Sequence, residues 1–89
     1  MDDKEMLKDC INTFKSTISF YGYTKNHELK DSCKTILEDI AKVVCLLIGI
    51  PVLDKRKKQV FQLLIDYGKG KISGKDFSIK FKELKNVCN

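Results

Sequence analysis

The sequence predicts an all-α protein, an antiparallel up-down-up-down four-helix bundle that forms one domain over residues 1–89. Apolar residues recur at helical spacings of three and four in four segments. Glycines, or a glycine followed by the single proline, separate these segments, and no stretch alternates with the period of a strand. Because short connections join the four helices, the simplest packing is an antiparallel bundle.

The first helix is predicted over residues 2–21, where acidic residues in the opening turn suit the helix dipole. Gly22 is its predicted C-cap. The second helix is predicted over residues 26–48, with Asn26 or Thr24 as N-cap, and Gly49 followed by Pro51 as the stop. The predicted buried stripe of the first helix is Leu7, Cys10, Ile11, Phe14, Ile18 and Tyr21. That of the second is Leu29, Cys33, Ile36, Leu37, Ile40, Val44, Leu47 and Ile48.

The third helix is predicted over residues 54–67 and the fourth over residues 73–87. Gly68 is predicted to end the third helix. Inward-facing residues of the third helix are Val60, Phe61, Leu64 and Tyr67, with Leu63 at the boundary. Those of the fourth are Phe77, Phe81, Leu84 and Cys88.

The connection between these two helices, GKGKISGKDFS at residues 68–78, has the composition of a phosphate-binding loop. The motif GxxxxGK[ST] requires a glycine where Lys69 stands and a hydroxyl where Asp76 stands, so a nucleotide loop is excluded. The stretch instead predicts a capping box, in which Ser73 accepts from the N–H of Asp76 and Asp76 returns a bond. Ile72 and Phe77 have the spacing of a hydrophobic staple.

The net charge of +5 is unevenly distributed along the chain. Residues 1–53 hold seven lysines and eight acidic residues, whereas residues 54–89 hold ten cations and four acidic residues. The four cysteines, Cys10, Cys33, Cys45 and Cys88, include no CxxC pair. No secretory signal precedes them, so the sequence predicts reduced thiols and a cytoplasmic location. The longest apolar run, residues 43–53, is too short to span a membrane.

The run DKRKK at residues 54–58 places four cations, Lys55, Arg56, Lys57 and Lys58, in the predicted first turn of the third helix. Positive charge is unfavourable there because of the helix dipole, and Asp54 offsets only part of the cost. The run therefore predicts an anion-facing patch for an acidic protein, a nucleic acid or a lipid surface. A solubilising run in a lysine-rich protein is the alternative.

Other residues give weaker indications of function. Tyr21 and Tyr23, in the stretch FYGY, form a second predicted contact surface, because tyrosine is common at binding hot spots. The alternative is that these rings cover the end of the bundle. His27 is the only histidine and is predicted to be an exposed helix-start residue. Glu28 and Asp31 share a helix face but lack further metal ligands in the sequence. We therefore expect no catalytic residue, metal or cofactor.

Residues 63–84, LLIDYGKGKISGKDFSIKFKEL, resemble a signature of small colicin-type immunity proteins, in which a helix leads to a g-x-I-[ST]-x-x-[ED]-F helix start. Ile72, Ser73, Asp76 and Phe77 match that pattern. The size, basic charge and predicted fold also resemble the immunity proteins of Gram-positive bacteriocins.

The resemblance implies a cytosolic non-enzyme that protects a bacterium by binding a toxin or the target of that toxin. Colicin-type inhibitors present acidic surfaces to basic nucleases, and the basic second half departs from that pattern. The alternative is a phage- or plasmid-type accessory protein that binds nucleic acid through residues 55–58. A protein partner is thus expected first and nucleic acid second.

Overall fold

The computed structural model describes residues 2–51 and 54–86. They form four α-helices: α1 (Asp3–Tyr23), α2 (His27–Leu47), α3 (Arg56–Gly68) and α4 (Gly74–Asn86). No strand occurs in these two ranges. The predicted all-α, up-down-up-down fold is confirmed, and the predicted bounds differ from the observed ones by at most two residues at described helix ends. Cys88 and the predicted end of the last helix at residue 87 lie outside the described residues.

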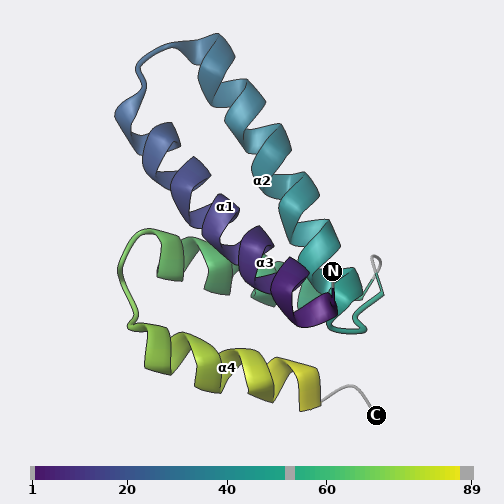
Figure 1. Ribbon diagram of the computed structural model, residues 1–89. Coiled ribbons are helices and arrows are strands. Elements are labelled where there is room, and N and C mark those ends of the chain that lie inside the picture. Colours follow the sequence, from purple (N-terminus) through teal and green to yellow (C-terminus); the bar gives the residue numbers. More distant parts are fainter. Residues whose placement is uncertain (1, 52–53, 87–89) are drawn as a thin grey trace.

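The helices form two antiparallel hairpins, α1–α2 and α3–α4 (Figure 1). Helix α3 is central to their packing, because it contacts α1, α2 and α4. Helix α4 lies along α3 and, among the described helices, has close backbone contact with α3 alone. Each hairpin therefore holds together along its own length, and α3 joins the two.

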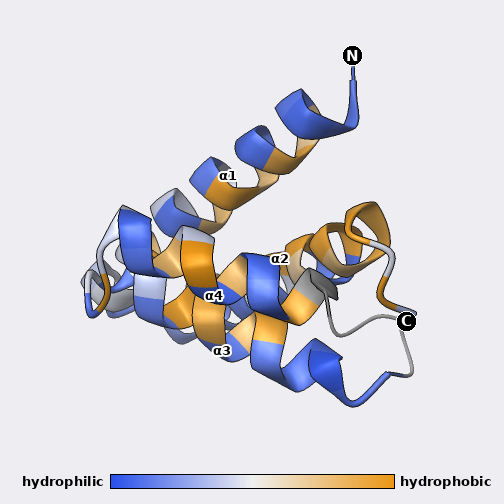
Figure 2. Ribbon diagram, turned by 90° about the horizontal axis from the view of Figure 1, so that it is seen from below, coloured by the Kyte–Doolittle hydropathy of each residue, from blue (hydrophilic) through white to orange (hydrophobic). Residues whose placement is uncertain are grey.

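The core lies where α3 meets the α1–α2 hairpin. Phe14 of α1 is 1% exposed and meets Phe61 of α3 edge-to-face, with 5.9 Å between ring centroids. Along the helices hydrophobic residues gather on one side and hydrophilic residues on the other, as amphipathic packing requires (Figure 2). The buried cluster consists of Phe14, Ile18, Leu37, Ala41, Val44, Cys45, Ile48, Ile50, Val60, Leu63, Leu64, Phe77 and Phe81.

Three core assignments made from the sequence are wrong. Leu63, predicted at the boundary, is buried at 7% exposure because α3 is covered on several sides. Leu29 and Ile36, predicted in the buried stripe of α2, are each 45% exposed. Their helical positions lie beyond the arc that α1 and α3 cover, so the apolar surface of α2 is wider than its packed surface.

Helix α1 begins as predicted but ends later. Asp2 is its N-cap, and the carboxylate accepts from the N–H of Glu5 at 2.9 Å. Gly22, the predicted C-cap, is instead an interior residue of the last turn. The helix continues because Gly22 does not adopt a positive φ, and the N–H of Thr24 still bonds to the carbonyl of Phe20 at 2.9 Å.

Helix α2 has the predicted cap and stop. The Asn26 side chain accepts from the N–H groups of Glu28 and Leu29, at 2.9 and 3.1 Å. At the other end Gly49 has a φ of 81°, a left-handed conformation that glycine adopts without strain. The N–H of Ile50 bonds back to the carbonyl of Cys45 at 2.8 Å, which completes a Schellman motif.

Helix α3 ends at a different glycine from the one predicted. Gly68 is its last helical residue, and Gly70 supplies the left-handed turn with a φ of 77°. The N–H of Lys71 bonds to the carbonyl of Asp66 at 2.9 Å, again in a Schellman arrangement. Gly68 is small for a packing reason, since a Cβ there would lie 2.9 Å from Cγ2 of Ile18 on α1.

Helix α4 starts at the predicted cap. The hydroxyl of Ser73 accepts from the N–H of Asp76 at 3.1 Å. The predicted return bond from Asp76 is not formed within the described residues, because the shorter aspartate replaces the usual glutamate. Ile72 packs against the core cluster, and Phe77 belongs to it. The glycine- and lysine-rich stretch is thus a helix stop, a turn and a helix start.

The cysteines of the described ranges are free thiols: Cys33 and Cys45 are buried and Cys10 is half-buried. Burial raises the pKa of the Cys45 and Cys10 thiols, and Asp9 raises the pKa of Cys10 further. These thiols serve as small apolar groups in the packing. None of the helices described, over residues 2–51 and 54–86, is both long and apolar enough to cross a membrane.

Candidate functional site: a basic groove at the start of α3

The basic run at the start of α3 is held by Asp54. The helix begins at Arg56 rather than at the predicted residue 54, and its N-cap, Lys55, provides no side-chain bond. Instead Oδ1 of Asp54 accepts from the backbone N–H of Arg56 at 2.8 Å and from its Nε at 3.0 Å. Nη2 of Arg56 donates to Oδ2 of Asp54 at 2.6 Å. The carboxylate thus satisfies a backbone donor and one cation together.

This pairing changes the ionisation of Asp54. Side-chain and backbone hydrogen bonds from Arg56 lower the pKa of Asp54 from its ordinary value of 3.8 to about 2. Asp54 is therefore ionised throughout the neutral range. The cost of positive charge at this helix start is offset more fully than the sequence alone indicates.

The four predicted contact residues take different positions. Arg56 is half-buried and paired with Asp54, so it organises the helix start. Lys55 and Lys58 are exposed, and Lys57 is half-buried. Of the predicted patch, Lys55, Lys57 and Lys58 are therefore the cations left for a partner, because Arg56 is paired with Asp54.

Two of these lysines line a groove between α2 and α3. The groove has a volume of about 590 Å³. Lys57 and Lys58 stand on the α3 side, and Lys42 of α2 joins them. The remaining lining residues are Glu38, Phe61 and Gln62. The structure thus adds a third ammonium group from a different helix, together with an aromatic ring.

The groove suits an anionic surface. Lysine ammonium groups on flexible stems bind phosphate and carboxylate as mobile point charges rather than by bidentate geometry. Phe61 offers apolar surface beside them, and Glu38 limits the excess of positive charge. Sequence reasoning missed Lys42 and Phe61, because the approach of α2 to α3 depends on the tertiary packing. The i, i+4 spacing of Glu38 and Lys42 was the available signal.

The aromatic turn divides into two environments. Tyr21 is half-buried, and the Nζ of Lys30 lies 5.2 Å from the centroid of its ring. Tyr23 is 84% exposed at the end of α1. Tyr21 therefore covers the hairpin end, whereas Tyr23 is available for contact, and the predicted binding role of both remains a prediction.

His27 is the first residue of α2 and is exposed, as the sequence indicates. Glu28 and Asp31 are exposed on the same helix. In the part of the chain that the structure describes, no three His, Cys, Asp or Glu side chains are grouped so that they could hold a metal ion.

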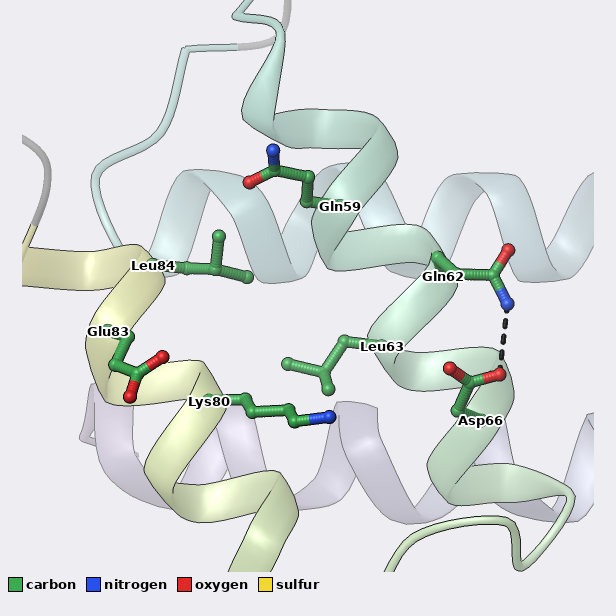
Figure 3. Close-up of a pocket in the computed structure, with 7 residues that line it drawn as sticks. All are labelled: Gln59, Gln62, Leu63, Asp66, Lys80, Glu83 and Leu84. Carbon is green, nitrogen blue, oxygen red and sulfur yellow. Dashed lines mark hydrogen bonds between the residues drawn. The ribbon is translucent and has the colours of Figure 1, made fainter.

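A second groove lies between α3 and α4 and has a volume of about 440 Å³ (Figure 3). On α3, Nε2 of Gln62 donates to Oδ1 of Asp66 at 2.9 Å. Lys80 extends from α4 toward α3, and Leu63 lies between the two helices. Its charged lining residues are one lysine, Lys80, and two carboxylates, Asp66 and Glu83, so this groove has a weaker preference for an anion than the basic groove.

The chain matches no protein-family model, no curated protein and no solved structure. The functional argument therefore depends on the geometry of this molecule.

Proposed function

We propose that this chain is a non-catalytic binding protein of the toxin-immunity class, which protects a cell by binding a toxin or the target of that toxin. The observation that carries the proposal is the basic groove, where Lys42, Lys57 and Lys58 converge from two helices beside Phe61. A groove of this composition contacts the acidic surface of a protein and buries the aromatic ring at the same time.

The immunity class is supported by the resemblance of residues 63–84. Ser73 caps α4, and Ile72 and Phe77 pack in the core, so the matched positions have structural roles. These roles explain the pattern as a helix start. The partner-binding role is assigned to the basic groove, whose lining residues all lie outside the matched stretch.

Nucleic acid is the second candidate partner, and the same three lysines favour it. A ligand held by three phosphate contacts would show an affinity that falls with salt, with a log–log slope of about −3. The chain has Arg56 as its only arginine, and that arginine is paired with Asp54. Arginine recognition of guanine edges is therefore not offered by the groove, and the lysines would contact phosphates, which carry no base sequence.

The proposal is tested by expressing the chain in sensitive bacteria and challenging them with a panel of bacteriocins and nuclease toxins. We expect protection against one toxin, seen as an increase of about tenfold or more in the inhibitory concentration. Lys57→Glu should abolish protection without loss of stability, because it removes positive charge from a helix start.

Lys75→Glu is the matched control, since Lys75 is exposed in the first turn of α4, away from the groove. It should protect as well as the unsubstituted chain. Absence of protection against every toxin, together with salt-dependent binding of a fluorescent duplex or single strand, would replace the immunity proposal with the nucleic-acid alternative.

A further inference from the structure

Large apolar side chains are exposed along one side of the α1–α2 hairpin. Met6 and Phe20 of α1 are 39% and 46% exposed, and Leu29, Ile36 and Val43 of α2 are between 39% and 45% exposed. Residues 6 and 20 of α1 lie fourteen apart, and residues 29, 36 and 43 of α2 lie seven apart. Because seven residues make almost two turns, each set lies along one line of its helix.

This side of the hairpin is the one away from α3. On α1, the residues that meet α3 are Ile18 opposite Gly68 and Phe14 against Phe61. On α2, Glu38 and Lys42 line the groove with α3. The exposed apolar lines lie on other arcs of the same helices, beside the α1–α2 contact where Cys33 is buried and Cys10 is half-buried. We call the surface made of Met6, Phe20, Leu29, Ile36 and Val43 the outer face.

The lysines of the hairpin helices lie elsewhere. Lys4 and Lys8 line a groove with α4, and Lys15 lies 4.9 Å from the centroid of the Tyr67 ring. Lys34 and Lys42 line grooves with α3. Lys30 stacks on Tyr21 at the hairpin end. The lysines of α1 and α2 thus lie on the sides that face α3 and α4, or at the end of the hairpin.

Acidic residues flank the outer face. On α1, Asp2 and Asp9 lie one helical turn from Met6, four residues before it and three after it, and Glu5 directly precedes Met6. On α2, Asp39 lies one turn from Ile36 and from Val43, and Glu28 directly precedes Leu29. All five carboxylates are exposed. The outer face is therefore an apolar strip with negative rims.

We propose that the outer face binds a cationic amphipathic helix of a partner protein or peptide. The apolar side of such a helix would lie across the exposed apolar residues of α1 and α2, with its lysines or arginines beside the acidic rims. From Leu29 to Val43 the strip is about 21 Å long, which matches about four turns of a helix. Helix-in-groove recognition uses anchors at this spacing.

The rim charges decide between this occupant and others. A second copy of the chain would bring acidic rims against acidic rims, which is unfavourable. A membrane surface with anionic lipids would be repelled by the same carboxylates. A cationic helix satisfies both the strip and the rims. The inference is independent of the proposed function, since the outer face and the basic groove share no residue.

The test uses a fluorescent synthetic helix of about 18 residues that contains only leucine and lysine, with its leucines along one face. We expect saturable one-to-one binding by anisotropy, and no binding of the matched leucine–glutamate peptide. Ile36→Ser should weaken binding about tenfold or more, because it removes the central apolar anchor. Ile79→Ser is the matched control, as Ile79 is 48% exposed on α4, and it should stay within about twofold of the unsubstituted chain.

The rims are tested in the same assay. Asp39→Asn should weaken binding about two- to fivefold at low salt, whereas Asp31→Asn, on another side of α2, should have no effect. Equal losses in Ile36→Ser and Ile79→Ser, or failure of the lysine peptide to bind, would overturn the inference. Dimerisation that Ile36→Ser abolishes, seen by sedimentation without peptide binding, would assign the outer face to a second copy. If the unsubstituted chain binds the peptide but protects bacteria against no toxin, the result would count against the proposed function and not against this inference.

Discussion

The two hairpins of this protein share one architecture and differ in length, charge and surface. Helices α1 and α2 have 21 residues each, whereas α3 and α4 have 13 each. The first hairpin falls in the half of the chain with more acids than lysines, and the second falls in the basic half. The first exposes a strip of large apolar side chains, and on the described part of α4 the large exposed apolar residue is Ile79.

The lengths and the packing of the two hairpins together explain much of the difference in surface. A helix of 13 residues is about 20 Å long, and one of 21 residues is about 31 Å long. The second hairpin cannot cover the first along its full length, and α4 packs on α3 rather than on α1 or α2. The comparison shows that the first hairpin has more apolar surface than the fold buries. The apolar surface that stays exposed is flanked by acidic residues.

The largest expected effect comes from separating the hairpins. Phe14→Ala should lower the free energy of unfolding by about 3–5 kcal/mol, because Phe14 is buried and its ring contacts Phe61 across the two hairpins. Phe20→Ala, on the outer face, should cost less than about 1 kcal/mol. Urea unfolding of both variants measures the difference, and equal losses would show that the outer face belongs to the core.

A pair of glycine substitutions should have opposite signs. Gly68→Ala should destabilise the protein by about 1–2 kcal/mol, because its Cβ would lie 2.9 Å from Cγ2 of Ile18. Gly22→Ala should stabilise it by about 0.5–1 kcal/mol, because Gly22 is helical and has open space around it. Thermal unfolding measures both changes. A higher melting temperature for both variants would contradict the close approach of α1 and α3 at Gly68.

The start of α4 tests the second hairpin alone. Ser73→Ala should cost about 1 kcal/mol, because it removes the hydroxyl that accepts from the N–H of Asp76. Ser78→Ala serves as the control, since Ser78 is exposed inside the same helix and alanine is the better helix former there. An unchanged urea midpoint for the Ser73 variant would refute the cap.

The smallest expected effect is that of Asp54→Asn on the free energy of unfolding, and it shows in how that stability depends on pH. Arg56 lowers the pKa of Asp54 from its ordinary value of 3.8 to about 2. The ionised carboxylate therefore stabilises the folded state fully at pH values above that ordinary pKa. That contribution is lost as the pH falls from about 4 to about 2. Asp54→Asn should therefore flatten the acid limb of a stability-against-pH curve. An acid limb identical to that of the unsubstituted protein would contradict the pairing.

Local chemistry made much of the fold predictable from the sequence. The caps at Asn26 and Ser73 and the stop at Gly49 follow from side chains and backbone within a few residues. The choice between Gly68 and Gly70 was not predictable in this way, because the reason for Gly68 is a side chain on another helix.

The candidate sites depend still more on tertiary packing. The basic run was visible in the sequence, but its pairing through Asp54 and its extension to Lys42 arise only when α2 and α3 meet. Likewise Leu29 and Ile36 fit a buried stripe by spacing, and they are exposed because they lie on the side of α2 away from α3. The spacing of apolar residues predicted which side of each helix is apolar. It could not predict how much of that side the neighbouring helices bury.

The difference between the hairpins is tested most directly by a heteronuclear NMR titration of the labelled protein with the leucine–lysine helix. We predict that the amide shifts change along the outer face, near Phe20, Ile36 and Val43, while the amides of α3 and α4 keep their positions. Shift changes centred on Lys57 and Lys58, or spread evenly over both hairpins, would contradict the claim that the first hairpin carries a binding face of its own.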